Sequence, residues 1–194
     1  MSWKEQLQKL QIDEEQLDIA VFFMKKVIEQ HPNDPDAYLS MLFLLEDAIQ
    51  EPHKWELYAY AEYNDPVKTA YYQELRIPEY RKLAPLYLQE GLKKFGNNAE
   101  FLYIACLIVE MCFWEFGVSE EDVYSWVEKA RILDPQNPIY QKVHGEEQMK
   151  AWHQLICASP SPLDKWDSIG PVGKYMKNIM QGSCENTLQN KIDQ

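Results

Sequence analysis

A short pattern that occurs three times constrains the fold of this chain more than any other feature. In each copy, small or apolar residues lie at positions i, i+4 and i+7, and a helix-breaking residue follows five positions later. The copies are Ala20, Met24 and Val27 before Pro32; Ala84, Leu88 and Gly91 before Gly96; and Val123, Val127 and Ala130 before Pro135. This spacing places an apolar stripe on each helix and a turn after it. It predicts an all-α chain of stacked antiparallel helical hairpins, an architecture that usually binds other proteins.

The same residues resemble the second helix and closing turn of the tetratricopeptide repeat (TPR) family, whose unit is about 34 residues long. The matching positions are Pro32 and Pro135 for the closing proline, with Gly96 in its place in the middle copy, and Ala20, Ala84 and Ala130 for the small residues. The resemblance also implies that Gly145 lets a partner helix approach closely. The breakers are 64 and then 39 residues apart, so the repeats are irregular.

Composition divides the chain near residue 157. We expect residues 1–157 to form the irregular TPR-like helical repeat domain. Residues 158–194 are expected to form a linker, a C-terminal capping helix and a frayed tail, because two prolines in 158–162 precede an amphipathic pattern that starts after Pro171. A partner-binding tail is the alternative for that last helix.

Apolar spacing and breakers also predict the individual helices. We expect helices from the acidic run at 13–16 to Pro32, from Pro35 to a break at Pro52, at 54–63, 66–75, 78–95 and 99–116, from Ser119 to Pro135, and at 138–157. Residues 99–116 are apolar on nearly every side, so this helix is predicted to be central. Ser119, followed by three acids, is a predicted N-cap.

The net charge of −12 is unevenly distributed, and residues 1–65 carry most of it. An acidic surface repels nucleic acid and anionic membranes and attracts basic proteins, although it can also serve solubility alone. The polar, acidic start does not resemble a signal peptide, which predicts a cytoplasmic protein. There the four cysteines, Cys106, Cys112, Cys157 and Cys184, are expected to be reduced thiols.

The sequence contains no recognisable catalytic motif, so we expect no enzyme and no cofactor. Cys106 and Cys112 lie in an apolar run and are predicted to be core thiols. His153 and Cys157 are four residues apart on a predicted helix, but zinc takes about four ligands at a structural site. His144 and Glu147 would join them only through chance packing, so no metal site is expected.

The groove positions of the TPR family, carried onto this chain, select a candidate partner-binding surface. They are Asp36, Leu39, Phe43 and Glu46; Glu100, Tyr103, Leu107 and Glu110; and Lys142, Glu146 and Met149. Acids mixed with apolar side chains suit a basic segment with apolar anchors. The family's carboxylate clamp needs basic residues that are absent here except for Lys142. The alternative is that Leu39, Phe43 and Leu107 belong to the core.

A second candidate surface is the aromatic stretch that contains Trp55, Tyr58, Tyr60 and Tyr63. Tryptophan and tyrosine are enriched at interface hot spots, and these four residues do not fit on one helix face. The alternative is that they pack an irregular insertion against the repeats.

Together these features predict an acidic, non-enzymatic protein-binding module that recognises a basic protein. The concrete role that we favour is an immunity protein that neutralises a cationic bacterial toxin, or a chaperone-like subunit. This analogy rests on size, charge and fold class. The alternatives are a self-assembling scaffold subunit, which would be a homo-oligomer, and an enzyme with a cryptic site.

Overall fold

The computed structural model of the chain is all-α, as predicted. It describes residues 1–10, 17–59, 77–141, 145–182 and 184; the side chains of residues 18, 51–59, 77 and 78 are not described. No strand occurs among the described residues. The elements are α1 (Trp3–Leu10), α2 (Leu17–Gln30), α3 (Pro35–Ala59), α5 (Ile77–Phe95), α6 (Ala99–Val109), the 3₁₀ helix η2 (Phe113–Phe116), α7 (Glu120–Leu133), η3 (Pro138–Tyr140), α8 (Gly145–Ile156), η4 (Asp164–Ile169) and α9 (Pro171–Gln181).

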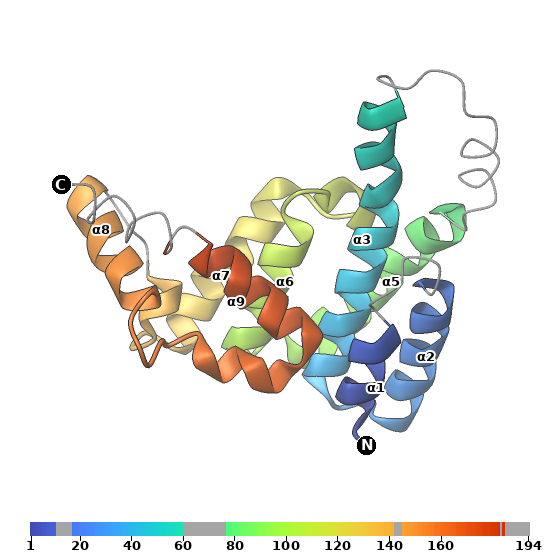
Figure 1. Ribbon diagram of the computed structural model, residues 1–194, viewed down its shortest axis with the longest axis horizontal. Helices are drawn as coiled ribbons and strands as arrows, with labels where there is room; N and C mark the ends of the chain where they lie inside the picture. Colours follow the sequence, from blue (N-terminus) through green and yellow to red (C-terminus); the bar gives the residue numbers. More distant parts are fainter. Residues whose placement is uncertain (11–16, 60–76, 142–144, 183, 185–194) are drawn as a thin grey trace.

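Helices α3 and α6 form the centre of the structure (Figure 1). Helix α3 packs against α2, α5 and α6, and α6 packs against α7. Most side chains of α6 are buried, including Leu102, Ile104 and Ile108, which confirms the prediction of a central helix. Among the described residues, no helix is long and apolar enough to cross a membrane.

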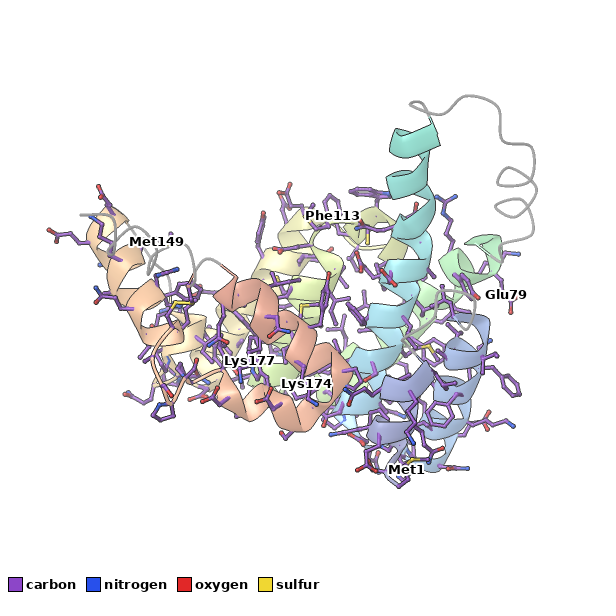
Figure 2. The ribbon with its side chains drawn as sticks, viewed as in Figure 1. Met1, Glu79, Phe113, Met149, Lys174 and Lys177 are labelled. Carbon is purple, nitrogen blue, oxygen red and sulfur yellow. A yellow bond between two sulfur atoms is a disulfide. The ribbon has the colours of Figure 1, made fainter. Side chains whose placement is uncertain are left out.

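Helix α9 lies across the body of the molecule and packs against α1, α3 and α6 as well as η4 (Figure 1). Lys177 of α9 forms ion pairs with Asp164 at 2.8 Å and Asp167 at 2.9 Å, which fix α9 to η4 (Figure 2). Trp166 of η4 is fully buried. The C-terminal segment is therefore part of the main packing, through an element, η4, that the sequence pattern did not predict.

The N-terminal helix α1 was also not predicted. Its Leu7 is fully buried, and the indole Nε1 of Trp3 donates a hydrogen bond of 3.2 Å to Asp34. A helix of eight residues is too short to be stable alone, so tertiary packing maintains it.

Helix α6 is shorter than the predicted helix at 99–116, because it ends at Val109. The chain turns at Cys112 and continues as η2, which packs against α5 and ends at Gly117, where φ is +69°. This turn lets Cys112 and Phe116 both be buried, which explains why apolar residues continue beyond the α-helix. The helix α7 that follows begins as predicted, since Ser119 and Asp122 form a capping box.

The predicted break at Pro52 is wrong, because α3 continues through it to Ala59. Proline removes one backbone hydrogen bond and costs roughly 3 kcal/mol inside a helix. A long helix that packs against four others, α2, α5, α6 and α9, can offset this cost, and α5 likewise contains Pro85. Of the predicted helices at 54–63 and 66–75, residues 54–59 belong to α3 and the remainder lies outside the described residues.

Gly145 does not have the close-packing role that the TPR resemblance implies. It begins α8 with φ of +78°, and apart from its chain neighbours no atom of the described residues lies within 4 Å of the position of a Cβ atom. Close approach occurs instead at Gly91 of α5, where a Cβ atom would lie 2.8 Å from the ring of Phe101.

Candidate protein-binding surface

Lysines of the same chain already pair with two acids of the predicted groove. Asp36, on the first turn of α3, forms an ion pair with Lys4 of α1. Burial raises the pKa of Asp36, and its hydrogen bond with Lys4 opposes this shift. Glu100, on the first turn of α6, lies 2.8 Å from the Nζ of Lys165 in η4. This part of the groove carries little uncompensated negative charge.

The apolar residues of the same region are covered as well. Leu39 is 1% exposed and belongs to the core. This is the alternative interpretation that the sequence analysis gave for this residue. The ring of Phe43, which is half-buried, lies 4.8 Å from that of Tyr175 in α9. Tyr103 is buried, with its ring centroid 4.9 Å from Tyr140 and 6.2 Å from Trp166. Thus η4 and α9 occupy the side of α3 and α6 that a ligand of the groove would contact.

Glu110 differs from these acids because its side chain is exposed and forms no ion pair within the described part of the chain. It is the C-cap residue directly after α6, and its backbone N–H donates to the carbonyl of Cys106 at 2.9 Å. Partial burial of the carboxylate raises its pKa. The C-terminal end of a helix also carries a partial negative charge. Burial and the helix dipole therefore both disfavour the ionised form of Glu110. No cation among the described residues compensates its negative charge.

Other acidic and aromatic groups lie near Glu110. A hydrogen bond to Glu120, together with the charges of Glu120 and Glu110, raises the pKa of Tyr124 in α7. Tyr124 is 57% exposed, and Met111, which follows Glu110 in the chain, is 69% exposed. We call Glu110, Met111, Glu120 and Tyr124 the Glu110 surface. It joins the C-terminal end of α6 to the N-terminal end of α7.

Glu46 and Leu107, two further predicted groove residues, are half-buried on α3 and α6. The charge of Glu46 contributes to raising the pKa of Cys112, so Glu46 lies near the turn that follows Glu110. Glu46, Leu107 and Glu110 therefore all lie toward the C-terminal end of α6, whereas Lys165 of η4 pairs with Glu100 on its first turn.

The last predicted groove residues lie elsewhere. Helix α8 lies at the far end of the molecule from α1 and α2, and Met149 on it is well separated from Phe113 near the upper part of α3 (Figures 1 and 2). Glu146 is exposed on α8 and pairs with Lys150 at 2.6 Å. Lys142 lies outside the described residues.

The predicted aromatic surface stays a prediction. Trp55 and Tyr58 belong to α3, but their side chains are not described. Tyr60 and Tyr63 lie outside the described residues.

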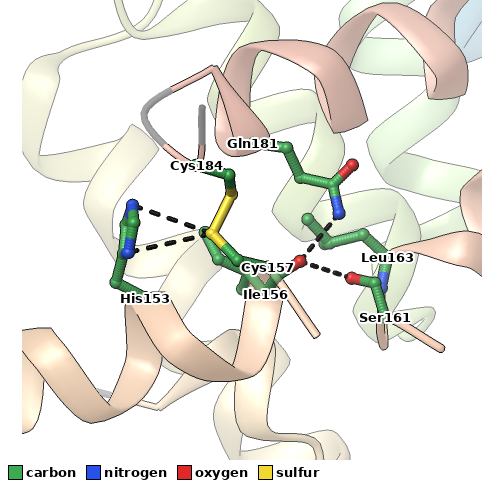
Figure 3. Close-up of a disulfide and its surroundings, with 7 residues drawn as sticks. All are labelled: His153, Ile156, Cys157, Ser161, Leu163, Gln181 and Cys184. Carbon is green, nitrogen blue, oxygen red and sulfur yellow. Dashed lines mark hydrogen bonds between the residues drawn. A yellow bond between two sulfur atoms is a disulfide. The ribbon is translucent and has the colours of Figure 1, made fainter. Parts of the chain in front are cut away.

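The expectation that all four cysteines are reduced thiols is wrong, because Cys157 and Cys184 form a disulfide (Figure 3). The two cysteines are 27 positions apart in the sequence, so no local pattern could have predicted that packing would bring them together. Cys106 and Cys112 are free and buried, as predicted for core thiols, and burial raises their pKa to about 12 and about 11. His153 lies beside Cys157, whereas His144 is outside the described residues.

Comparisons of this chain with protein-family models, with curated proteins and with solved structures found no match. The candidate surface is therefore argued from its own geometry and charge.

Proposed function

We propose that this chain is a non-enzymatic protein-binding module that recognises a basic protein through the Glu110 surface. The observation that carries the proposal is the electrostatic position of Glu110. Its carboxylate is partly desolvated, lies at the negative end of α6 and has no compensating cation among the described residues. Uncompensated charge of this kind is unfavourable for folding and is typical of functional sites.

The chemistry of the Glu110 surface indicates the kind of partner. A lysine or arginine that approaches Glu110 would compensate its charge, and Glu120 would add to the attraction. Tyr124 and Met111 offer exposed aromatic and apolar contact area beside these acids. The ligand that fits is a basic protein segment with an apolar side chain next to its cation. Neutralisation of a cationic toxin, or protection of a basic partner as a chaperone-like subunit, is the role that this recognition would serve.

A self-assembling scaffold is the second candidate, favoured by the exposure of large apolar side chains. Trp114 is 60% exposed and Met111 is 69% exposed, close together at the turn after α6. Contact between copies of the chain would cover them. Light scattering over a range of concentrations distinguishes the two functions, because a scaffold gains mass with concentration and a partner-binding module does not.

The experiment that tests the proposal uses the purified chain as bait in lysate of its native source, at low and at high salt. One basic protein retained in stoichiometric amount at low salt and released at high salt supports it. A Glu110→Lys bait should lose that protein, whereas a Glu146→Lys bait, changed on α8, should retain it. Equal retention by the wild type and Glu110→Lys would reject the Glu110 surface as the binding site.

A further inference from the structure

Three side chains that can bind a metal meet where the ends of α8 and α9 lie side by side (Figure 3). His153 lies in the last turn of α8, and Cys157 directly follows the helix, where its backbone N–H donates to the carbonyl of His153 at 3.0 Å. Residues four apart in this conformation lie on the same side of a helix. Cys184 follows the end of α9. One ligand atom from each residue lies within 4.8 Å of the other two, and all three residues are half-buried.

Contacts other than the disulfide hold this arrangement together. The carbonyl oxygen of Ile156 accepts hydrogen bonds of 2.7 Å from both Gln181 of α9 and Ser161 (Figure 3). Ile156 directly precedes Cys157, and Gln181 is three residues before Cys184. The hydrogen bond from Gln181 therefore joins the ends of the two helices independently of the disulfide.

We propose that, once the disulfide is reduced, His153, Cys157 and Cys184 bind one zinc ion, with water as the fourth ligand. Zinc–sulfur and zinc–nitrogen bonds of about 2.3 and 2.0 Å in a tetrahedron separate neighbouring ligand atoms by about 3.5–3.8 Å. The two ring nitrogens of His153 lie 3.7 and 3.8 Å from the sulfur of Cys157. The His153 ring is thus already as far from the Cys157 sulfur as two neighbouring zinc ligands would be. Thiolate and imidazole together are a ligand set that zinc prefers.

The change between the two forms needs a thiol reductant. Two small-molecule thiols supply two electrons, the bond between Cys157 and Cys184 breaks to give two thiols, and the reductant becomes a disulfide. Zinc then replaces the two thiol protons, which pass to solvent, and a ring nitrogen of His153 donates its lone pair to the ion.

Both forms would link the same two helices. The disulfide closes a loop between residues 27 apart in the chain, and a shared zinc ion would close the same loop. Helix α8 lies at the edge of the structure and packs on η3, so this link supports its position. The cluster would therefore fix α8 under oxidising conditions as a disulfide and under reducing conditions as a metal site.

The test is a zinc titration of the reduced full-length chain without oxygen, in competition with a coloured chelator. We expect one zinc ion per chain in reduced protein and none in oxidised protein. His153→Ala, Cys157→Ser and Cys184→Ser should each weaken binding by more than about 100-fold, beyond the roughly 10–100-fold effect usual for outer-shell changes. Cys112→Ser is the matched control and should bind zinc as the wild type does, because that thiol is buried away from the cluster.

A second measurement replaces zinc with cobalt, whose absorption reports thiolate ligands directly. Thiolate charge-transfer bands in the wild type that disappear in Cys184→Ser would support the site. Reduced protein that keeps its helical circular dichroism but binds no zinc would overturn the proposal. So would zinc binding of unchanged affinity in His153→Ala or in the oxidised protein.

Discussion

The Nζ of Lys165 lies 2.8 Å from a carboxylate oxygen of Glu100, so an ion pair joins η4 to the first turn of α6. Next to this pair, Trp166 packs near Tyr103, with ring centroids 6.2 Å apart. Lys165 and Trp166 of the same chain therefore lie at positions where the TPR resemblance implies contacts with a binding partner. Glu110, at the other end of the same helix, forms no ion pair with the residues that the structure describes.

Replacing Trp166 with alanine should detach the C-terminal segment from α6. The side chain is fully buried, and removing a buried tryptophan costs about 3–5 kcal/mol. Urea denaturation would measure the loss of unfolding free energy. Hydrogen exchange should show the accompanying loss of protection in α9, and protection equal to that of the wild type would contradict this packing.

Gly173 should be intolerant of alanine. A Cβ atom at this position would lie 2.1 Å from the carbonyl oxygen of Trp166 and 2.8 Å from the Cβ of Ile169. Helix α9 would have to move away from η4, at a cost of about 1–3 kcal/mol in thermal or urea denaturation. Gly182→Ala is the control, since its nearest atoms are 3.4 Å away and the residue has helical φ. Equal effects of the two substitutions would show that the close approach at Gly173 is absent.

Glu110→Gln should make the folded protein slightly more stable at neutral pH. Burial raises the pKa of Glu110 above its ordinary value of 4.5. A raised carboxyl pKa contributes stability below that ordinary value and loses it as the pH rises through the folded-state pKa. The side chains near Glu110, namely Tyr103, Cys106 and Tyr124, have pKa values that are themselves raised, so they stay neutral in this range.

The stability gain in Glu110→Gln should be small, at most about 0.5 kcal/mol, as for most surface substitutions. It should be present at pH 7 and vanish in melting curves recorded below pH 4.5, the ordinary value. The opposite trend, with the variant less stable at pH 7, would mean that an attractive partner within the chain stabilises Glu110.

Thiol labelling should distinguish the two kinds of cysteine. Native protein kept without reductant should take up almost no alkylating reagent at pH 8, because Cys157 and Cys184 are bonded and Cys106 and Cys112 are buried. Burial raises the pKa of these last two thiols to about 12 and about 11, so they are protonated. After mild reduction, mass spectrometry should find labels on Cys157 and Cys184 alone. Labelling of Cys106 in folded protein would contradict the buried core.

Local patterns were sufficient to predict the features of this fold that depend on neighbouring residues. The all-α class, the central position of α6 and the cap at Ser119 follow from apolar spacing and hydrogen-bonding side chains within one turn. The features that were missed depend on residues far apart in the chain. The ion pair of Lys165 with Glu100 and the disulfide of Cys157 with Cys184 arise only after the C-terminal segment has packed.

The candidate surface was predicted in part. The groove positions implied by the TPR resemblance selected Glu110 together with Asp36 and Glu100, but they could not distinguish an acid paired within the chain from an unpaired one. Tyr124 was missed because it lies on α7, a helix that the TPR resemblance did not assign to the groove.

The measurement that tests the central claim most directly is the rate at which the retained basic protein associates with wild type, Glu110→Lys and Glu146→Lys over a range of salt concentrations. Charge reversal at the binding surface should slow association by about tenfold at low salt and flatten its salt dependence. Glu146→Lys, on the distant helix α8, should associate as the wild type does. A folded Glu110→Lys variant with wild-type rates at every salt concentration would contradict the account.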